Sequence, residues 1–358
     1  MLLGEERGRA WIVSLLFAPV LCCILIAGLW PFRAPQNEVT WLANDHAVRL
    51  GKRGTILSAG PLAGRNPGSC TVEMRLRPSQ SEASGTLLAF YGESGVVGLS
   101  LHQSLTDLRL DSNVSRGWPV KRYIGDVFQA GRPLFLTVAS GPQGTSVYLD
   151  GALARQFPGF LPSPPLCSGS FVVGDSPSAD NTWQGELSGL AIYQQDLSAE
   201  QVMLNYQSWN RAGRPGTGSG KPDALYLFNE NGGNLVCDHG MSGVSLSIPE
   251  RYVIAQPAFL ESPWRLHDGT SDDVKDILVN IGGFVPFGFT LSALLSLRGR
   301  SRWIGANTVL AGLLVSLTIE VLQAYLPTRN SDFRDVLTNV LGSWLGMILL
   351  RKWLRMSV

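Results

Sequence analysis

The sequence predicts a multi-domain membrane protein that combines an antiparallel β-sandwich (jelly roll) with a small transmembrane α-helical bundle. Three observations predict it. Long apolar segments lie near both ends of the chain, short alternating runs fill its middle, and polar side chains interrupt the C-terminal apolar segments. The composition agrees, because 45% of the 358 residues are hydrophobic and only 16% are charged, which is an apolar balance for a chain of this length.

The formal net charge of the chain is +1. A protein that binds nucleic acid through its phosphates normally carries a basic patch or stripe. The sequence has no such field, and it has no acidic tail. We therefore expect no nucleic-acid partner and a membrane as the main non-protein surrounding.

Four apolar segments are candidates for membrane spans, at residues 10–30, 277–297, 303–326 and 336–352. A helix needs roughly 20 apolar residues to cross the hydrocarbon core. The first three segments meet this length, and the fourth reaches it if Arg351 and Lys352 extend to the interface. The first segment is too long for the apolar part of a signal peptide and large residues follow it, so we expect a retained anchor.

Basic residues predict the orientation of the spans. The loop 298–302 and the tail 351–355 each carry three positive charges, and Arg7 and Arg9 precede the first span. Loops rich in Lys and Arg remain on the cytoplasmic side. We therefore expect a multi-pass protein with both termini in the cytoplasm and with the large region 31–270 outside.

The predicted domains follow the chain in order: a cytoplasmic N-terminus (1–9), an anchor (10–30), a β-sandwich (38–255), a linker (256–271) and a C-terminal membrane domain (272–352). Strand-like runs such as 71–78, 134–140 and 145–151 alternate apolar and polar residues between Gly, Pro and Ser, which is typical of a sandwich. One helix is expected at 197–207, where Ser198 and Gln201 have the spacing of a capping box.

Three cysteines, Cys70, Cys167 and Cys237, lie in the region predicted to be outside. An exported compartment permits disulfides. Because three is an odd number, at most one pair can form within the chain, and the sequence leaves the pairing open.

Several of the strand-like runs occur in an order that resembles a known family. These are TVEMRLRP (71–78), SVYLDGALA (146–154), FVVGD (171–175) and GELSGLAIYQQDLSAEQV (185–202), followed by ALYLFNENGG (224–233). The set resembles the laminin-G-like, concanavalin A-like lectin/glucanase sandwiches. The resemblance implies a domain that binds glycans or proteins, in some cases with calcium.

Candidate ligand and catalytic residues in the sandwich are sparse. Asp150, Asp175 and Asp180 are scattered and lack the spacing of a calcium loop, so we expect no cofactor, with calcium as the alternative. Glu73 is followed by Arg75 and Arg77 and has no second carboxylate on its strand, which disfavours glycoside hydrolysis. The aromatic side chains Trp118, Tyr123 and Trp183 either stack on sugar rings or belong to the core.

The C-terminal spans carry polar residues at similar depths near their outer ends. A carboxylate in the hydrocarbon costs at least ~2.5 kcal/mol, so these side chains should gather inside the bundle. We predict a polar pocket at the outer membrane face, with structural hydrogen bonds between the spans as the alternative. The predicted ligand-binding residues are Asp276, Asn280, Glu320, Gln323, Arg329, Asp332, Arg334, Asp335 and Asn339.

The same residues form three motifs in order: D-x-x-x-N-x-x-x-F-x-P-F-G from Asp276, I-E-x-x-Q from Ile319, and R-x-x-D-x-x-D-x-x-x-N-x-x-G from Arg329. Over 272–352 they resemble the VanZ-like membrane family. The resemblance implies a bacterial cytoplasmic (inner) membrane location. It also implies a link to glycopeptide resistance, notably to teicoplanin.

We expect a non-enzymatic cell-envelope protein. In this hypothesis the sandwich binds an extracytoplasmic glycan or an envelope protein. The polar pocket engages the head group of an outer-leaflet amphiphile or a lipid-linked sugar, with Arg329 and Arg334 on its phosphate or carboxylate. Two alternatives stay open: an enzyme that acts on a lipid-linked sugar or phosphate, with Glu320 or Asp335 as base, and a purely structural membrane-tethered interaction module.

Overall fold

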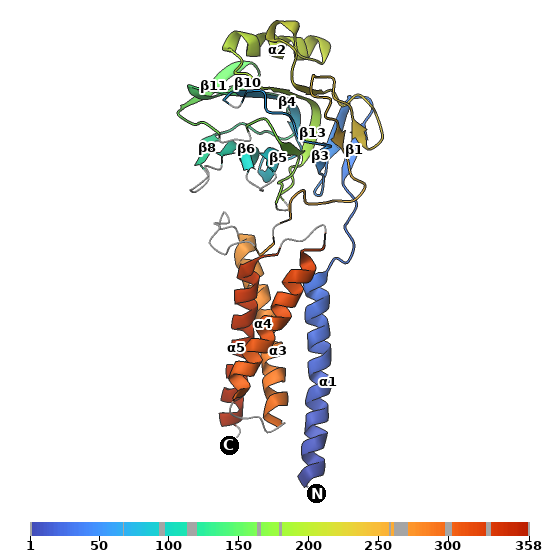
Figure 1. The fold of residues 1–358 in the computed structure, drawn as a ribbon, viewed down its shortest axis with the longest axis vertical. Coiled ribbons are helices and arrows are strands. Elements are labelled where there is room, and N and C mark those ends of the chain that lie inside the picture. The colour runs from blue at the N-terminus through green and yellow to red at the C-terminus, as the bar shows by residue number, and fades with distance from the viewer. Residues whose placement is uncertain are drawn as a thin grey trace. The chain divides into compact units, whose positions relative to one another are not determined.

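The computed structural model describes residues 2–66, 68–92, 97–112, 120–162, 166–178, 181–257, 259–260, 271–297, 303–326 and 331–356. The chain divides into two compact units. The membrane unit comprises Met1–Arg33 and Pro257–Val358, and the sandwich unit comprises Ala34–Gln256. Figure 1 shows the four long helices of the first and the two sheets of the second.

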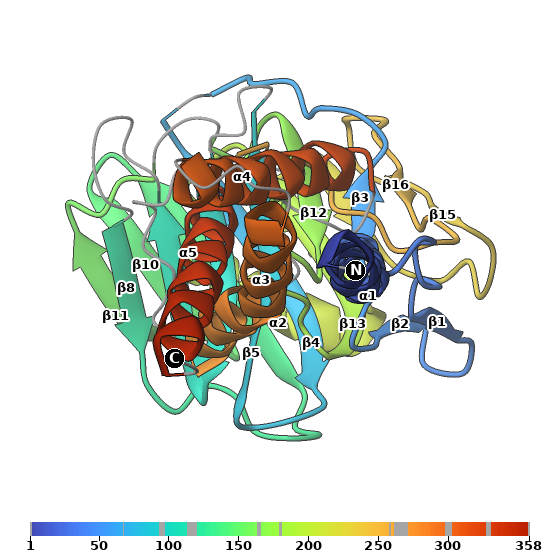
Figure 2. The same cartoon turned by 90° about the horizontal axis from the view of Figure 1, so that it is seen from below.

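The membrane unit consists of long helices. They are α1 (Leu2–Leu29), α3 (Ser271–Leu297), α4 (Ile304–Gln323) and α5 (Phe333–Met356). Figure 2 shows α1 nearly end-on and α4 lying across the view. Helix α3 contacts α1, α4 and α5. Three segments are long and apolar enough to cross a membrane, Val274–Leu297, Ile304–Gln323 and Phe333–Arg355, and a shorter apolar stretch occupies Leu15–Leu29 among the described residues.

Glycines allow α3, α4 and α5 to approach closely. A Cβ atom added at Gly288 would lie 2.0 Å from the carbonyl oxygen of Ser343, and one at Gly346 would lie 2.1 Å from that of Val285. At Gly312 it would lie 2.3 Å from Oγ of Ser343. Small residues at helix contacts are the usual means by which membrane helices pack, since lipid supplies little hydrophobic drive between them.

The sandwich unit contains two sheets in which every described strand pair is antiparallel. The first sheet has the order β1-β2-β13-β4-β9-β10-β11, with β14 beside β13, and the second has the order β15-β16-β3-β12-β5-β6-β7-β8. The first-sheet strands are β1 (Val39–Leu42), β2 (Ala47–Leu50), β4 (Cys70–Pro78), β9 (Leu134–Gly141), β10 (Gly144–Leu149), β11 (Ala152–Pro158), β13 (Gly185–Tyr193) and β14 (Ala224–Tyr226). The second-sheet strands are β3 (Ile56–Ser58), β5 (Ala83–Tyr91), β6 (Val97–Leu105), β7 (Asp107–Ser112), β8 (Val120–Ile124), β12 (Ser170–Val173), β15 (Leu235–Val236) and β16 (Leu246–Ser247).

The main apolar core lies between the two sheets. Alternate residues of β4, such as Val72 and Leu76, meet residues of the second sheet such as Phe90 and Leu101. Alternation places every second side chain of a strand on the inner face, which is how a sequence of short alternating runs becomes a sandwich. The predicted fold class, a β-sandwich with an apolar helical bundle, is confirmed.

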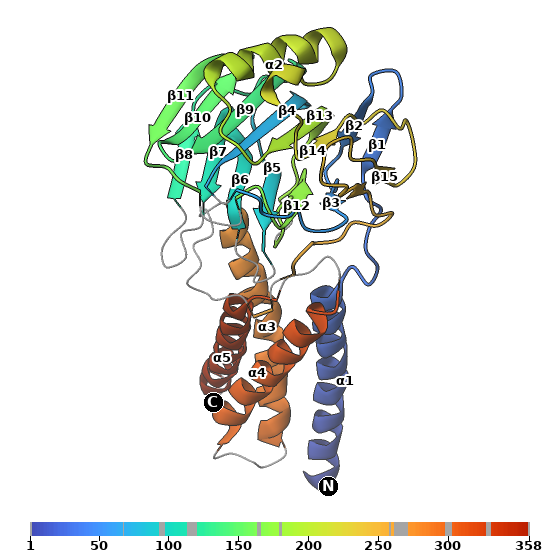
Figure 3. The same ribbon diagram turned by 45° about the horizontal axis from the view of Figure 1, so that its top comes forward.

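Helix α2 (Ala199–Ala212) covers the outer face of the first sheet, as Figure 3 shows. The predicted capping box is present, because the Ser198 side chain accepts a hydrogen bond from the Gln201 N–H and the Gln201 side chain accepts one from the Ser198 N–H. Trp209 and Val202 of α2 pack against Tyr193 and Phe135 of the sheet in a second apolar cluster. The helix therefore closes one outer face of the sandwich.

The cysteine pairing that the sequence left open is settled within the sandwich unit. A disulfide joins Cys70 to Cys167, and Cys237 is an exposed free thiol. The glycine-rich stretch 211–221 holds the short 3-10 helix η1 (Thr217–Ser219). Ser219 donates a hydrogen bond to Asn205 of α2 at 3.0 Å, so this stretch is part of the domain.

Candidate functional site

The membrane unit buries a polar stripe along α4. The buried residues of this helix are Thr308, Gly312, Ser316, Ile319, Glu320 and Gln323. Four of them recur at intervals of four residues, which places them on one helical face. Most of the interior face of a predicted span is therefore small or polar, while its apolar side chains point outward.

Glu320 is the most enclosed charged side chain of this stripe, with 1% of its surface exposed. One of its carboxylate oxygens accepts a hydrogen bond from the backbone N–H of Asp332 at 2.9 Å. Asp332 precedes α5 and its own carboxylate accepts a hydrogen bond from the N–H of Arg334 at 2.8 Å, which is an N-cap contact. The last turn of α4 is thus tied to the first turn of α5.

Gln323 and Asn339 each use one end of the side-chain amide and leave the other end without a hydrogen-bond partner. Gln323 donates to the carbonyl oxygen of Gly28 in α1 at 2.7 Å, and Asn339 donates to Oγ of Ser316 at 3.0 Å. The carbonyl oxygens Oε1 of Gln323 and Oδ1 of Asn339 are buried and accept no hydrogen bond. Buried acceptors are rarely left in this state.

The structure brings together only part of the predicted pocket. Glu320 and Asp332 are in contact, and Arg334 lies 3.7 Å from Asp332. Gln323 contacts α1 through Gly28, and Asn339 contacts α4 through Ser316. Asp335 is half-buried in the first turn of α5.

Two predicted residues of α3 lie away from this interior. Asp276 is exposed and Asn280 is half-buried. Arg329 lies outside the described residues, so its predicted role stays a prediction.

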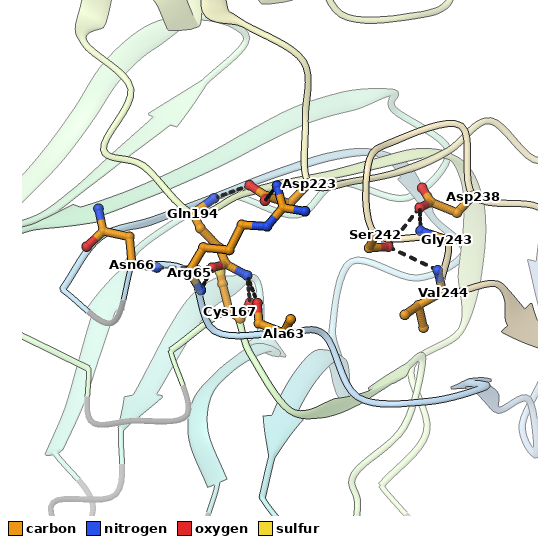
Figure 4. Close-up of polar contacts among 10 residues, drawn as sticks. All are labelled: Ala63, Arg65, Asn66, Cys167, Gln194, Asp223, Asp238, Ser242, Gly243 and Val244. Carbon is orange, nitrogen blue, oxygen red and sulfur yellow. Dashed lines mark hydrogen bonds and ion pairs between the residues drawn. The ribbon is translucent and has the colours of Figure 1, made fainter.

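A cavity of about 100 Å³ lies in the sandwich unit, at the edge where β13 ends. It is lined by Pro61, Leu62, Ala63, Arg65, Gln194, Asp223, Ser242 and Val244. Figure 4 shows Arg65 extended toward Asp223, with Nη1 of the guanidinium 3.5 Å from a carboxylate oxygen of Asp223. The Arg65 side chain is 56% exposed and that of Asp223 is 14% exposed, so the charged pair is accessible from solvent.

Gln194 fixes one wall of this cavity. Its side-chain oxygen accepts hydrogen bonds from the N–H groups of Arg65 and Asn66, and its side-chain nitrogen donates to the carbonyl oxygens of Ala63 and Cys167 (Figure 4). The side-chain amide of Gln194 thus joins the 63–66 loop to Cys167. Because Cys167 is bonded to Cys70 of β4, the loop is anchored to the sandwich core.

Asp238 fixes the opposite wall. Its carboxylate accepts hydrogen bonds from the N–H groups of Leu225, Gly240 and Gly243, and from Oγ of Ser242, all between 2.7 and 2.8 Å. The backbone carbonyl of Asp223 receives the N–H groups of Met241 and Ser242. This turn therefore holds the main chain of Asp223 in place and leaves its carboxylate facing Arg65.

Sequence reasoning did not find this cavity. Arg65 is more than a hundred residues away from Gln194 and Asp223 in the sequence, and none of the three stands in a recognisable motif. The stretch DHGMSG after Cys237 predicts a turn, but it does not indicate which distant residues that turn contacts.

Glu73 occupies a different kind of site, beneath α2, and is fully buried. Its carboxylate accepts hydrogen bonds from Asn205 at 2.8 Å, Trp209 at 3.1 Å and the Tyr193 hydroxyl at 3.4 Å. Burial raises the pKa of Glu73 to about 7, against the lowering effect of these donors. The Glu73 carboxylate therefore holds α2 against the first sheet. Among the residues that the structure describes, the hydrogen-bond partners of this carboxylate include no second carboxylate, which a glycoside hydrolase site would need.

The aromatic candidates separate clearly. Trp183 is 2% exposed and its indole N–H donates to Gln103 at 2.8 Å, so the interpretation of Trp183 as a sugar-stacking residue is wrong and it belongs to the core. Tyr123 is 44% exposed on β8, opposite Arg109 in register. Trp118 lies outside the described residues.

The candidate calcium aspartates serve the local backbone where they are described. Asp175 accepts hydrogen bonds from the N–H groups of Ser176 and Asn181 and from the Tyr252 hydroxyl, and Asp150 accepts one from the N–H of Phe135. Asp180 lies outside the described residues. Among the residues that the structure describes, no group of three or more His, Cys, Asp or Glu side chains is arranged to hold a metal ion.

Comparison with known families identifies two regions. Residues 51–203 match the concanavalin A-like lectin/glucanases superfamily, and residues 227–355 match the VanZ/LLP1 family. Both resemblances drawn from the sequence are confirmed, and the chain is a membrane protein with a VanZ-like region. The VanZ/LLP1 match begins inside the sandwich unit, directly after β14, and includes the turn of Asp238. None of the curated proteins matches the chain.

Solved structures with a similar fold are distant. They include a candidate carbohydrate binding protein from Bacteroides ovatus (12% identity, TM-score 0.40, 54% of this chain and 55% of that one) and the binding domain of botulinum neurotoxin serotype D (14%, 0.39, 49% and 45%). A native heptameric SAP-like pentraxin from Limulus polyphemus shares 17% identity, with a TM-score of 0.34 and coverage of 57% and 99%. The chain spans about half the length of the first two proteins.

Proposed function

We propose that this chain, with its concanavalin A-like and VanZ-like regions, is a membrane-anchored receptor whose sandwich binds a carbohydrate. The observation that carries the proposal is the cavity between Arg65 and Asp223. A small-molecule site is a hollow in which a few fixed polar groups set the orientation of the ligand. Here an exposed guanidinium and a carboxylate, 3.5 Å apart, stand over rigid walls.

The charges of the cavity favour a neutral, hydroxylated ligand. Arg65 and Asp223 cancel in net charge, so neither an anion nor a cation is preferred. The carboxylate accepts hydrogen bonds from hydroxyls, and the guanidinium donates to them. Two adjacent hydroxyls of a sugar ring present donors and acceptors at the spacing that such a pair requires.

The size of the cavity favours the end of a glycan over a whole saccharide. A volume of about 100 Å³ corresponds to roughly three water molecules at ~30 Å³ each. One edge of a pyranose or one hydroxymethyl group fits this space, while the rest of the ligand stays outside. We therefore propose that the cavity binds the terminal sugar of a glycan and that the neighbouring protein surface contacts the following sugars.

A glycan array probed with the full-length protein in detergent tests this function. The variants are Arg65→Met and Asp223→Asn, which remove one charge each and keep the walls, since Asn can still accept the N–H of Gln194. We expect at least a tenfold loss of binding in either variant. Arg77→Met is the matched control, because Arg77 also pairs with a carboxylate at 2.9 Å and is 45% exposed, but it does not line the cavity.

Two outcomes would contradict the proposal. One is the same binding pattern in Arg65→Met as in the wild type, which would place the ligand elsewhere on the sandwich. The other is equal loss in Arg77→Met, which would mean that the arginines act through general charge.

The cell-envelope setting is a further part of the proposal. The basic loops support a multi-pass protein of the bacterial cytoplasmic membrane, with both termini inside and the sandwich outside. In that setting the ligand is an extracytoplasmic glycan, and the VanZ-like region connects the chain to glycopeptide tolerance. Cells that lack the protein would be given the wild type or the Glu320→Ala/Asp335→Ala form at equal membrane level. Survival of teicoplanin only with the wild type would support this role, and equal survival in both would contradict it.

A further inference from the structure

Two side-chain acceptors in the buried helix contacts of the membrane unit have no hydrogen-bond donor. They are Oε1 of Gln323 and Oδ1 of Asn339, and both side chains are more than nine-tenths buried. Glu320, one turn before Gln323, adds a carboxylate that is 1% exposed. Asn339 bonds Ser316 of α4, one turn before Glu320, so the three acceptor groups are spread over about two turns of this helix.

Glu320 and Gln323 lie at the boundary between head groups and acyl chains, whereas Asn339, which bonds Ser316, lies about two turns deeper than Gln323. Gln323 is the last residue of α4, and Glu320 stands three residues earlier, or about 4.5 Å along the axis at 1.5 Å per residue. In this zone an amphiphile presents its polar group, whereas a few turns deeper only hydrocarbon is available. The C-terminal end of α4 also carries the negative pole of its helix dipole.

An unsatisfied carbonyl costs free energy in this environment. Without water, each buried acceptor that lacks a donor is expensive. The unused amide oxygen of Gln323 points to a ligand that supplies N–H or O–H groups. The carboxylate of Glu320 and the helix dipole add a preference for positive charge.

We propose that the outer end of α4 binds the primary ammonium group of a membrane aminophospholipid, with Glu320 as the charge partner and with Gln323 as the neutral acceptor. A primary ammonium group carries three N–H donors and one positive charge, which matches the two carboxylate oxygens of Glu320 and Oε1 of Gln323. This chemistry differs from the phosphate contact that the loop arginines suggested, and it is independent of carbohydrate binding by the sandwich.

The α1 helix takes part in this site indirectly. The Gln323 amide nitrogen donates to the carbonyl oxygen of Gly28 at 2.7 Å, and that bond fixes which end of the amide remains available. Asn339 is fixed in the same way by Ser316. The Gln323 acceptor is thus pre-oriented, which lowers the cost of ordering it on binding.

Native mass spectrometry of the full-length protein tests the proposal with phosphatidylethanolamine, its mono- and dimethylated forms, phosphatidylcholine and phosphatidylglycerol of equal acyl chains. Methylation removes N–H donors one at a time and keeps the phosphate. We expect retention to fall stepwise along this series, to at least tenfold less for phosphatidylcholine, and Glu320→Gln to abolish the preference. Ser296→Ala, whose hydroxyl bonds only within α3, is the matched control.

Each other result would overturn the proposal. Equal retention of all lipids means that water alone satisfies the acceptors. Preference for phosphatidylglycerol means that hydroxyls, and not an ammonium group, are recognised. An unchanged preference in Glu320→Gln places the lipid elsewhere. Because Glu320→Gln could assemble poorly, its helical circular dichroism in phosphatidylcholine must equal that of the wild type, and the methylation series tests the proposal without any substitution.

Discussion

Glu73 in the sandwich unit and Glu320 in the membrane unit are both carboxylates with almost no exposed surface, yet their surroundings differ. Glu73 accepts hydrogen bonds from three side chains of α2 and the first sheet. Glu320 accepts a backbone N–H, and two nearby amide oxygens accept nothing. A buried carboxylate with a full set of donors has a structural role, whereas we propose that the carboxylate beside unsatisfied acceptors binds a ligand.

The two units are also held together differently. The sandwich has an apolar core between its sheets and a disulfide. The membrane unit has apolar side chains outside, and its helices approach through glycines. Perturbations that act on one mechanism should leave the other unit intact, and the following predictions use this separation.

Loss of the Cys70–Cys167 disulfide should have the largest effect. The bond closes a 97-residue separation, and a loop of this length corresponds to roughly 4 kcal/mol of stabilisation. We expect the Cys70→Ala/Cys167→Ala form to lower the unfolding free energy of the sandwich by about this amount and to leave the helical melting transition unchanged. Denaturant titration followed by tryptophan fluorescence measures it, with Cys237→Ser as the control.

The pH dependence of sandwich stability comes next. The pKa of Glu73 in the folded state, about 7, lies above its ordinary value of 4.5. The contribution of Glu73 to the unfolding free energy of the sandwich is therefore fully present below about pH 4.5, and it is lost as the pH rises through about 7. The difference corresponds to roughly 3 kcal/mol.

The Glu73→Gln form isolates this contribution. We expect it to be less stable than the wild type at pH 4.5, because the side-chain NH2 of the glutamine would face the donor groups of Asn205, Trp209 and Tyr193. We also expect its unfolding free energy to lose the pH dependence between about 4.5 and 7. An equal slope of unfolding free energy against pH in both proteins would contradict the structural role of Glu73.

Helix approach in the membrane unit can be tested at a single glycine. Gly346→Ala places a Cβ 2.1 Å from the Val285 carbonyl oxygen, and overpacking of this kind costs roughly 1–3 kcal/mol. Gly283→Ala is the control, because nothing lies within 4 Å of the added Cβ. Only the first should lower the melting temperature of the helical signal in detergent, and a similar loss from both would contradict close glycine packing.

Exposed ion pairs should contribute least. Arg77 pairs with Glu186 at 2.9 Å at the sandwich surface, and such pairs contribute about 0–1 kcal/mol. Arg77→Met should therefore leave the unfolding free energy of the sandwich within this range. A loss of several kcal/mol would show that surface charges, and not the core, hold the sandwich.

These contrasts also explain what the sequence could predict. Period-two alternation fixes strands and the capping box of Ser198 and Gln201, because both depend on near neighbours. Glu320, Gln323 and Asn339 were predictable because polar residues stand out in an apolar span. Spacing also placed Asp276 in the pocket, but its turn of α3 is exposed.

Other features depend on contacts between distant residues and left no local signal. The Arg65–Asp223 cavity is assembled by Gln194 and by a turn more than a hundred residues from the first loop. The cysteine pairing has the same character, because nothing near Cys70 distinguishes Cys167 from Cys237. For Trp183 the sequence left open whether the side chain stacks on a sugar or belongs to the core, and its burial and its hydrogen bond to Gln103 decide for the core.

The most direct test of the contrast between the two carboxylates is the melting temperature of the full-length protein in nanodiscs of phosphatidylethanolamine and of phosphatidylcholine. The account predicts a higher helical melting temperature in phosphatidylethanolamine for the wild type and for Glu73→Gln, and no difference between the lipids for Glu320→Gln. If Glu320→Gln keeps the full lipid-dependent difference, the Glu320 cluster is not a ligand site and serves only to hold the helices together.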